Sequence, residues 1–206
     1  MQEDNRKVFE KDIKEAIISF PNLSIKCQNN NKYLKGILDI NGCGAYLIEI
    51  RYKEGYPKRY PHLLEVGGEI PNIADYHKYQ DNSCCLTVAA DEILKCINGI
   101  TVKGFIKDVA IPYFANQLVK KESGEYIQEY SHGSTGIIEF YSQLLGTSNL
   151  NMIKTIILSV FYGHLNKNDN CICGSRLKTY KCHFDSMIKL AQIGKQQVMF
   201  DLKLML

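Results

Sequence analysis

The stretch of sequence that decides the fold is LSIKCQNNNKYLKGILDINGCGAYLIEIRY, residues 23–52. It contains three runs of apolar and β-branched residues, and each run has the length of a strand. An asparagine triplet and an Asn-Gly-Cys-Gly segment separate them, and both compositions favour the tight turns of hairpins. The stretch therefore predicts three consecutive antiparallel strands: Leu23–Gln28, Tyr33–Ile40 and Ala45–Tyr52.

The segments on either side of this meander set the fold class. Upstream, apolar residues recur at helical spacing from Asp4 to Phe20, and Pro21 ends that helix. Downstream, the proline-bearing link YPKRYP leads to a short apolar run, Leu63–Val66, which predicts a fourth strand. A helix followed by a meander is an α+β order, so we expect a four-stranded antiparallel sheet flanked by helices.

The rest of the chain combines an irregular segment with further helices. Gly67–Asn98 has no clear periodicity, and a long connection of this kind is often functional. Helical spacing returns in Val102–Ile111, which Pro112 ends or kinks. Three more helices are predicted around residues 137–145, 150–161 and 186–193. The terminal QQVMFDLKLML, residues 196–206, alternates like a strand but also fits a short helix.

Composition narrows the class of protein. The 206 residues are 45% hydrophobic and carry a formal net charge of +3, which is too mild to indicate nucleic acid or a membrane surface as a partner. The charged start MQEDNRKVFEKD does not resemble a signal peptide. We therefore expect a soluble, cytoplasmic protein. In a reducing cytosol, the eight cysteines favour metal binding or catalysis over disulfides. Cys27, Cys43 and Cys96 are scattered and are interpreted as small apolar residues.

One group of cysteines lies close together in the sequence near the C-terminus. The segment NCICGSRLKTYKCHF, residues 170–184, offers three thiolates and one imidazole, the ligand set of a closed Cys₃His zinc site. It resembles the SEC-C zinc motif. The residues that carry the likeness are Cys171, Cys173, Gly174, Ser175, Tyr180, Lys181, Cys182 and His183, and Ile172 stands where a proline is common. We expect Cys171, Cys173, Cys182 and His183 to bind one structural Zn²⁺ in a small knuckle, because a fully occupied site leaves no position for substrate.

The cysteine doublet in NSCCLTV, residues 82–88, raises the question of chemistry. Adjacent side chains on an extended backbone point to opposite sides, so Cys84 and Cys85 should meet different environments. His77 lies eight positions before Cys85. The two could form a protease-like dyad, although no protease signature surrounds them, and a packing role for His77 is the alternative.

The order of these segments resembles the ubiquitin-conjugating (E2) fold, and most closely its bacterial E2-like branch. The likeness is carried by Tyr56, Pro57, Tyr60, Pro61, His77, Asp81, Asn82, Ser83, Cys85 and Leu86. Further on, HGSTGIIEFY, residues 132–141, is similar to a segment that follows the core helix of those bacterial proteins. The resemblance implies an E2-like catalytic domain at residues 1–146. A helical extension with the zinc knuckle would follow at residues 147–206.

The resemblance also implies a function. Bacterial relatives are encoded in CBASS anti-phage operons beside cGAS/DncV-like nucleotidyltransferases, and their cysteine carries a protein C-terminus as a thioester that passes to an acceptor. Here the nucleophile would be Cys85, because it directly precedes Leu86, and Cys84 would face inward. The asparagine that eukaryotic relatives use for the oxyanion is not matched, since Asn72 lies too far upstream in the sequence. His77 or Asn82 would take that role, and the nucleotidyltransferase would be the partner.

Two other classes of function remain open. The chain could be a catalytically inert E2-like binding module with a structural zinc site. It could also be a zinc-dependent nucleic-acid binder, but RLKTYK is the only basic stretch interleaved with an aromatic residue, and we expect no nucleic-acid partner.

Overall fold

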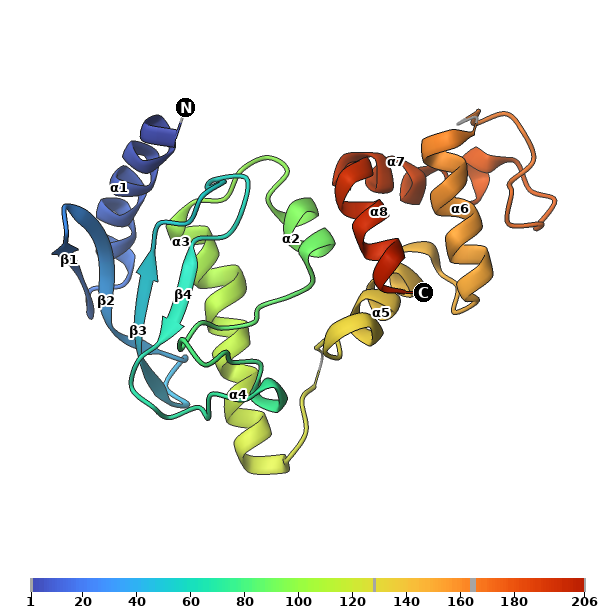
Figure 1. Cartoon of the computed structure of the whole chain (residues 1–206). Helices are drawn as coiled ribbons and strands as arrows, with labels where there is room; N and C mark the ends of the chain where they lie inside the picture. Colours follow the sequence, from blue (N-terminus) through green and yellow to red (C-terminus); the bar gives the residue numbers. More distant parts are fainter. Residues whose placement is uncertain (1, 128, 164–165, 206) are drawn as a thin grey trace. The chain divides into compact units, whose positions relative to one another are not determined.

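The computed structural model describes residues 2–127, 129–163 and 166–205, which form two compact units (Figure 1). The first unit comprises the described residues of Met1–Thr87 and Lys95–Glu129, and the second those of Val88–Leu94 and Tyr130–Leu206. The sequence placed a domain boundary at 146/147 instead. The structural boundary falls earlier because the helix at 133–145 buries its apolar face in the core of the second unit.

The first unit is built on the predicted four-stranded antiparallel sheet. Its strands are β1 (Leu23–Gln28), β2 (Asn31–Asp39), β3 (Ala45–Arg51) and β4 (His62–Glu65), and they pair in chain order. The turn residues Asn29, Asn30 and Asn41 have positive φ angles, a conformation that asparagine tolerates better than most residues. The register places Ile48 opposite Glu65. The α+β class and the antiparallel meander are therefore confirmed.

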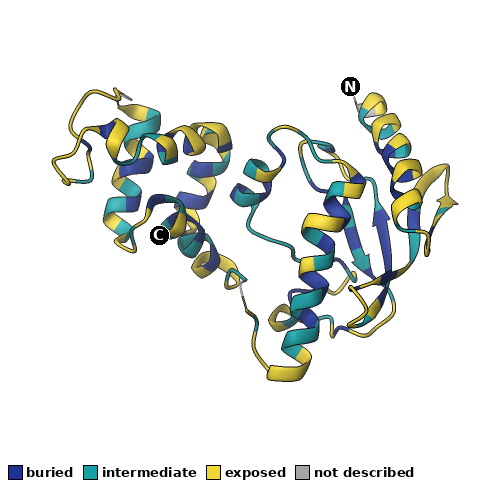
Figure 2. Cartoon of the chain, turned by 180° about the vertical axis from the view of Figure 1, so that it is seen from behind, coloured by how far each residue is buried: buried dark blue, intermediate teal, exposed yellow. Residues whose placement is uncertain are grey.

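Helices cover the apolar face of this sheet. They are α1 (Gln2–Ser19), α3 (Val102–Phe105), the π-helical segment η2 (Ile106–Ala110) and α4 (Ile111–Ser123). The short 3₁₀ turn η1 (Ala74–Tyr76) lies in the connection after β4 and has no buried residues. Helices α3, η2 and α4 run on as one helix beside the sheet (Figures 1 and 2). Phe9 and Ile13 of α1, Leu34 and Ile48 of the sheet, and Phe105 of α3 share one buried core.

The long helix does not end at Pro112. Proline lacks the backbone N–H that a helix interior needs, but it is tolerated in the first turn. In the structure Pro112 occupies the first turn of α4, and the preceding turn is π-helical, with the Ile111 N–H bonded to the Ile106 carbonyl. The wider turn accommodates Pro112 within one helix, which continues to Ser123. The predicted helix therefore extends well beyond Ile111.

The second unit is helical. It contains most of α2 (Ala89–Lys95), together with α5 (Gly133–Leu145), α6 (Leu150–Tyr162), the 3₁₀ turn η3 (Thr179–Lys181), α7 (Phe184–Ile193) and α8 (Lys195–Leu204). Tyr141 on α5 is fully buried and donates a hydrogen bond to Asp201 Oδ2 on α8 at 2.9 Å. This bond satisfies both polar groups within the core.

Two expectations for irregular or ambiguous segments are corrected. The connection at residues 67–98 contains η1 and α2, although its sequence shows little periodicity. The C-terminal segment is helical: Val198 and Leu202 are buried at helical spacing, whereas the alternating positions Phe200 and Leu204 are exposed. Leu206, the last residue of that alternation, lies outside the described residues.

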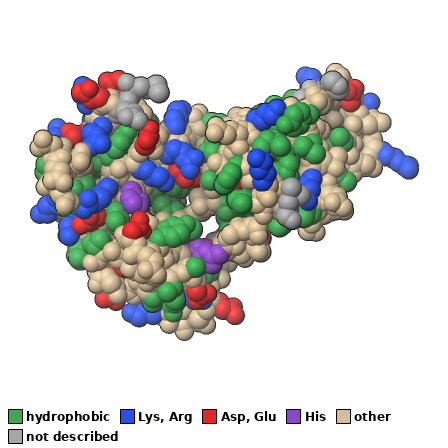
Figure 3. Space-filling model, viewed as in Figure 1, with side chains coloured by type: hydrophobic (Ala, Val, Ile, Leu, Met, Phe, Trp, Pro, Cys, Tyr) green, Lys and Arg blue, Asp and Glu red, His purple; other side chains and the backbone are tan. Residues whose placement is uncertain are grey.

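The described surface shows mixed charge. On the face seen in Figure 3, acidic and basic side chains are interspersed with apolar ones. Among the described residues, no single helix is long and apolar enough to cross a membrane, and only α5 and α6 taken together, with a 70° bend between them, pass that test.

Candidate functional site

The cysteine doublet lies on a short hairpin, residues 77–85, which we call the cysteine hairpin. The Tyr79 N–H donates to the Ser83 carbonyl at 2.9 Å, and the Cys85 N–H donates to the His77 carbonyl at 2.7 Å. The returning arm also pairs with β4, because the Cys84 N–H donates to the Leu63 carbonyl at 3.0 Å. The hairpin is thus fixed to the edge of the sheet.

This attachment separates the two cysteines. Cys84 is buried and belongs to the core, so the two cysteines meet different environments, as the alternation predicted. Burial raises the pKa of its thiol to about 12, against the opposing effect of a hydrogen bond with Tyr113. Cys85 is partly exposed, and its interaction with the Tyr79 hydroxyl helps to raise the pKa of that hydroxyl to about 12. Because a thiolate is the reactive form of cysteine, the Cys84 thiol, which is mostly protonated near neutral pH, is expected to react slowly.

An ion pair that the sequence analysis missed holds the inner side of the cysteine hairpin. The Lys78 ammonium contacts the Glu65 carboxylate, and both side chains are fully buried. Lys78 Nζ also donates to the Ile70 carbonyl at 2.9 Å, and Glu65 Oε1 accepts from the Gly67 N–H at 2.7 Å. Further polar bonds are what a buried ion pair requires, since desolvation is costly. The available signal was Glu65 itself, two positions from the buried Leu63 on the same face of β4.

The side chain of His77 contacts residues in the last segment of the first unit. It is buried and adopts a left-handed backbone conformation. Its Nε2 lies 3.0 Å from Glu129 Oε2, and its ring packs edge-on against Tyr126 with 5.1 Å between centroids. Burial raises the pKa of Glu129 to about 7, while a hydrogen bond from Asn116 opposes the shift. His77 was predicted as an auxiliary group, but its partner Glu129 was not predicted from the sequence.

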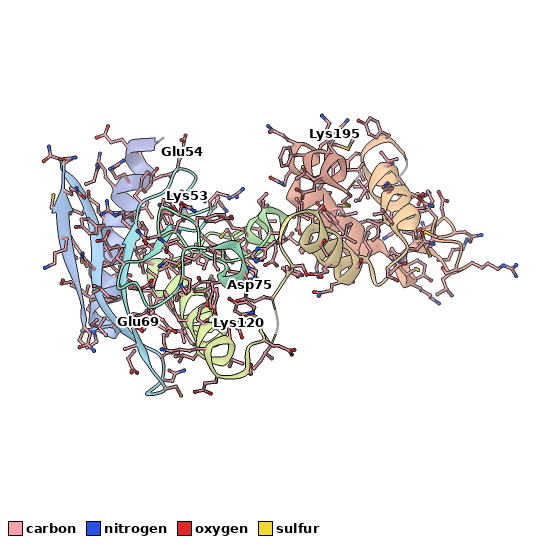
Figure 4. The ribbon with its side chains drawn as sticks, turned by 60° about the horizontal axis from the view of Figure 1, so that its bottom comes forward. Lys53, Glu54, Glu69, Asp75, Lys120 and Lys195 are labelled. Atoms are coloured by element: carbon pink, nitrogen blue, oxygen red, sulfur yellow. The ribbon has the colours of Figure 1, made fainter. Side chains whose placement is uncertain are left out.

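A second ion pair lies at the same end of the unit. Lys120 Nζ on α4 is 3.3 Å from Asp75 Oδ2 on η1, and the two side chains approach each other in Figure 4. The Lys120 ammonium also lies over the ring of Tyr126, 5.1 Å from its centroid. Tyr126, which packs against His77, therefore also contacts Lys120 of α4.

Asn82 occupies the turn of the cysteine hairpin. Its φ angle is positive, and its Oδ1 accepts a hydrogen bond from Asn72 Nδ2 at 2.9 Å. The structure thus brings Asn72, which seemed too distant in the sequence, into contact with the turn. Beside it, Asp81 accepts from the Ser83 hydroxyl and N–H, and these bonds lower the pKa of its carboxyl group. The described contacts give Asn82 a part in shaping the turn.

The second polar site is the thiol cluster, which consists of Cys171, Cys173, Cys182 and His183 in the second unit. A turn closed by the Gly174 N–H and the Cys171 carbonyl presents the first two thiols, and the next two ligands follow η3 at the start of α7. The four ligand atoms all lie within 4.8 Å of one another. The predicted ligand set is therefore brought together, and it can hold a metal ion.

The distances in the thiol cluster suit four-coordinate binding. Cys173 and Cys182 sulfurs are 3.5 Å apart, and His183 Nδ1 lies 3.3 Å from Cys171 Sγ and 3.1 Å from Cys182 Sγ. Ligand atoms around a tetrahedral zinc ion are separated by about 3.4–3.8 Å, given its usual bond lengths. Small outward movements would therefore accommodate the ion.

The orientation of His183 favours ligation. Its Nε2 lies 2.8 Å from the Leu145 carbonyl at the end of α5. A carbonyl can only accept, so in a neutral imidazole this nitrogen carries the proton and Nδ1 has a lone pair on the side of the thiols. Metal-binding histidines usually have such a partner on the other ring nitrogen. The pKa of Cys173 also falls to about 6, because hydrogen bonds led by Ser175 outweigh its burial.

Comparison of the chain with protein-family models, curated proteins and solved structures gives no match. The two sites are therefore interpreted from their own geometry.

Proposed function

We propose that the chain is an E2-like conjugating enzyme that carries a protein C-terminus as a thioester on Cys85. The observation that supports this most directly is the contrast within the doublet. Cys84 is buried with a raised pKa, whereas Cys85 reaches the surface beside a hydroxyl group. A reactive cysteine needs access to its substrate and a polar environment for its thiolate.

The architecture of the first unit is compatible with this proposal. A helix, a four-stranded meander and a cysteine-bearing loop beside the last strand follow one another in the order that the E2-like resemblance implies. The link between β3 and β4 contains Tyr56 and Tyr60, and both side chains are buried in the core. These features support an E2-like fold.

The proposed reaction exchanges one thioester for another. The Cys85 thiolate attacks the carbonyl carbon of an incoming thioester, a new C–S bond forms, and the sulfur of the donor leaves as a thiolate. An amine of the acceptor then attacks the same carbon. The amide C–N bond forms, and the Cys85 sulfur leaves and takes up the proton that the amine loses.

The partner that we propose is a cGAS/DncV-like nucleotidyltransferase in bacterial anti-phage defence. This part rests on the sequence resemblance, including HGSTGIIEFY, which in the structure spans His132 and the first nine residues of α5. The nucleotidyltransferase would supply the conjugated C-terminus or accept it.

We further propose that the thiol cluster holds one structural Zn²⁺. Three thiolates and an imidazole suit zinc, and all four positions of a tetrahedral site would be filled by protein ligands. The ion would join the turn after Asn170 to the start of α7, so its role would be stability rather than catalysis.

A synthetic peptide thioester tests the proposed function without a cellular partner. The full-length protein is incubated with a glycine-terminated peptide activated as a mercaptoethanesulfonate thioester, and the modified cysteine is located by mass spectrometry. We expect a thiol-reversible acyl adduct on Cys85. It should form faster than on Cys27 and Cys43, which are exposed cysteines of the same unit and serve as internal controls.

Substitutions then assign the adduct. Cys85→Ser should abolish it and Cys84→Ser should leave it in place. The proposal fails if Cys85 is acylated no faster than Cys27 and Cys43, and the inert binding module would then be the better description. An adduct that disappears only in Cys84→Ser would reverse the assignment of the doublet.

A further inference from the structure

The cysteine hairpin places a phenol next to the proposed nucleophile. The backbone bonds of Tyr79 with Ser83 and of Cys85 with His77 make Tyr79 and Cys85 diagonal neighbours on the same face of the hairpin. Long aromatic side chains reach across such diagonals. Here the Tyr79 hydroxyl interacts with Cys85, and this interaction raises the pKa of the hydroxyl, while the Tyr79 residue remains 56% exposed.

Several other polar side chains of the hairpin have different partners. Asn82 Oδ1 accepts from Asn72, and His77 Nε2 lies against the Glu129 carboxylate. The Asp81 carboxylate accepts from Ser83 and is ionised at neutral pH, so it has no proton to donate. Among these side chains, Tyr79 is the one with a described interaction with the reacting cysteine.

We infer that Tyr79 is a catalytic residue that donates a hydrogen bond to the acyl oxygen while Cys85 gains or loses its acyl group. The inference rests on the proposed thioester function and deepens it. When the thiolate attacks, the π electrons of the carbonyl move to its oxygen, and the Tyr79 O–H stabilises that negative charge without giving up its proton. When the intermediate collapses, the C=O bond re-forms, the leaving group departs, and the Tyr79 hydroxyl again faces Cys85 Sγ.

The chemistry of Tyr79 suits this role. Its hydrogen bond with Cys85 and partial burial raise the pKa of its hydroxyl to about 12, so it remains a neutral donor at physiological pH. The acyl oxygen would be two covalent bonds from Cys85 Sγ, so a side-chain rotation moves the hydroxyl from one atom to the other. Loss of one oxyanion donor typically costs 10²–10³ in rate. Because Tyr79 is exposed and water competes with it, we expect about 10- to 100-fold.

Two reactions of the same sulfur test the inference. Tyr79→Phe removes only the hydroxyl, and its effect is measured on acyl transfer from the glycine-terminated peptide thioester and on alkylation by iodoacetamide. Acyl transfer passes through an oxyanion, whereas alkylation displaces iodide and does not. We expect Tyr79→Phe to slow acylation of Cys85 by about 10- to 100-fold and to change its alkylation less than twofold. Tyr33→Phe, which removes a hydroxyl from β2, should change neither rate.

The outcomes separate this inference from the proposed function. If the wild-type protein acylates Cys85 but Tyr79→Phe does so at the same rate, Tyr79 is not a catalytic residue. If acylation and alkylation fall in parallel, Tyr79 acts on the thiol or its accessibility, and the inference is overturned. If wild-type Cys85 is not acylated preferentially, the proposed function fails and the role of Tyr79 fails with it.

Discussion

The two compact units use cysteine and histidine in opposite ways. In the cysteine hairpin the backbone directs Cys84 into the core and Cys85 to the surface, so two adjacent thiols never share a site. In the thiol cluster, residues up to twelve positions apart converge until their ligand atoms lie within 4.8 Å of one another. Because the two thiols of the doublet point apart, one of them remains available for reaction. The ligand atoms of the thiol cluster lie close together, an arrangement that favours a bound ion.

The two histidines extend this comparison. Each has its Nε2 close to an oxygen, which is a carboxylate of Glu129 for His77 and the backbone carbonyl of Leu145 for His183. The carbonyl cannot titrate, but the carboxylate can, and its pKa is near 7. The first unit therefore contains a buried carboxyl group whose charge state changes near neutral pH, whereas the second contains a ligand set that can hold a metal ion.

The largest expected effect is on the second unit. Protein purified without added metal should contain about one zinc per chain by elemental analysis. Cys171→Ser or a chelator should remove the ion. Because structural zinc contributes about 10–16 kcal/mol to the folding of isolated zinc fingers, we expect residues 166–184 to lose protection against proteolysis.

Cys43→Ser is the control for this experiment, because Cys43 is an exposed cysteine outside the thiol cluster. It should retain metal and protease resistance. The alkylation rate of Cys85 should stay unchanged on metal removal, since the ion would act on the second unit. A metal-free protein that remains protected across residues 166–184 would contradict the structural role of the site.

The next largest effect is expected at the buried ion pair of the first unit. Lys78→Met leaves the Glu65 carboxylate buried without its cation, and breaking such a pair typically costs 3–5 kcal/mol of unfolding free energy. The loss can be measured by the urea concentration at which the buried thiols Cys84 and Cys96 become reactive.

Lys32→Met provides a matched comparison, because Lys32 pairs with Glu10 at 2.6 Å on the surface. Exposed pairs contribute about 0–1 kcal/mol, so this variant should differ little from wild type. A double variant, Lys78→Met with Glu65→Leu, should recover part of the loss because it removes the isolated charge. Equal effects of Lys78→Met and Lys32→Met would show that the buried ion pair contributes no more to stability than the surface pair does.

The smallest effect is a pH dependence at Glu129. Its pKa is about 7 in the folded protein and ordinarily near 4.5, so the unfolded chain loses this proton at lower pH than the folded chain does. Stability should therefore fall as pH rises from about 4.5 to 7 and level off above that. Glu129→Gln cannot ionise, and we expect it to gain about 1–3 kcal/mol relative to wild type across this window.

The same urea-dependent thiol labelling, repeated at pH 5, 6, 7 and 8 on both proteins, provides the measurement. Glu125→Gln is the control, since Glu125 is an exposed carboxylate four residues earlier. A difference between wild type and Glu129→Gln that does not change with pH would show that Glu129 titrates normally.

Periodicity and turn chemistry predicted the elements that depend on local sequence. The strands of the meander and the helix before them follow from alternation, asparagine turns and Pro21. The extension of the long helix past Pro112 was not predicted, because its π turn is not visible as periodicity. The C-terminal helix was ambiguous, because whether Phe200 or Leu202 is buried depends on its contacts with other helices.

The two sites also differ in how far their residues could be predicted from the sequence. Cys171, Cys173, Cys182 and His183 were predictable because the spacing of their ligands reflects the chemistry of a metal ion. The partners of the cysteine hairpin come from distant segments: Glu65 from β4 and Glu129 from the chain after α4. A single sequence carries little sign of such pairings. Tyr79 was not predicted either, although it lies between His77 and Cys85 in the sequence.

The π turn before Pro112 has a consequence for how this chain tolerates insertions and deletions. A π turn holds one residue more than an α-helical turn, so deleting a single codon within Ile106–Ala110 could convert it to a regular helix. The later residues of α4 would then keep their orientation, because the regular turn covers the same rotation with one residue fewer. A one-residue deletion in α3 would instead rotate every later residue by about 100° and shift it by about 1.5 Å. Tyr113 and Gln117, which donate to the carbonyls of His77 and Tyr76, would then lose those acceptors. The cysteine hairpin thus depends on the residue count of a helix to which it is not adjacent in sequence.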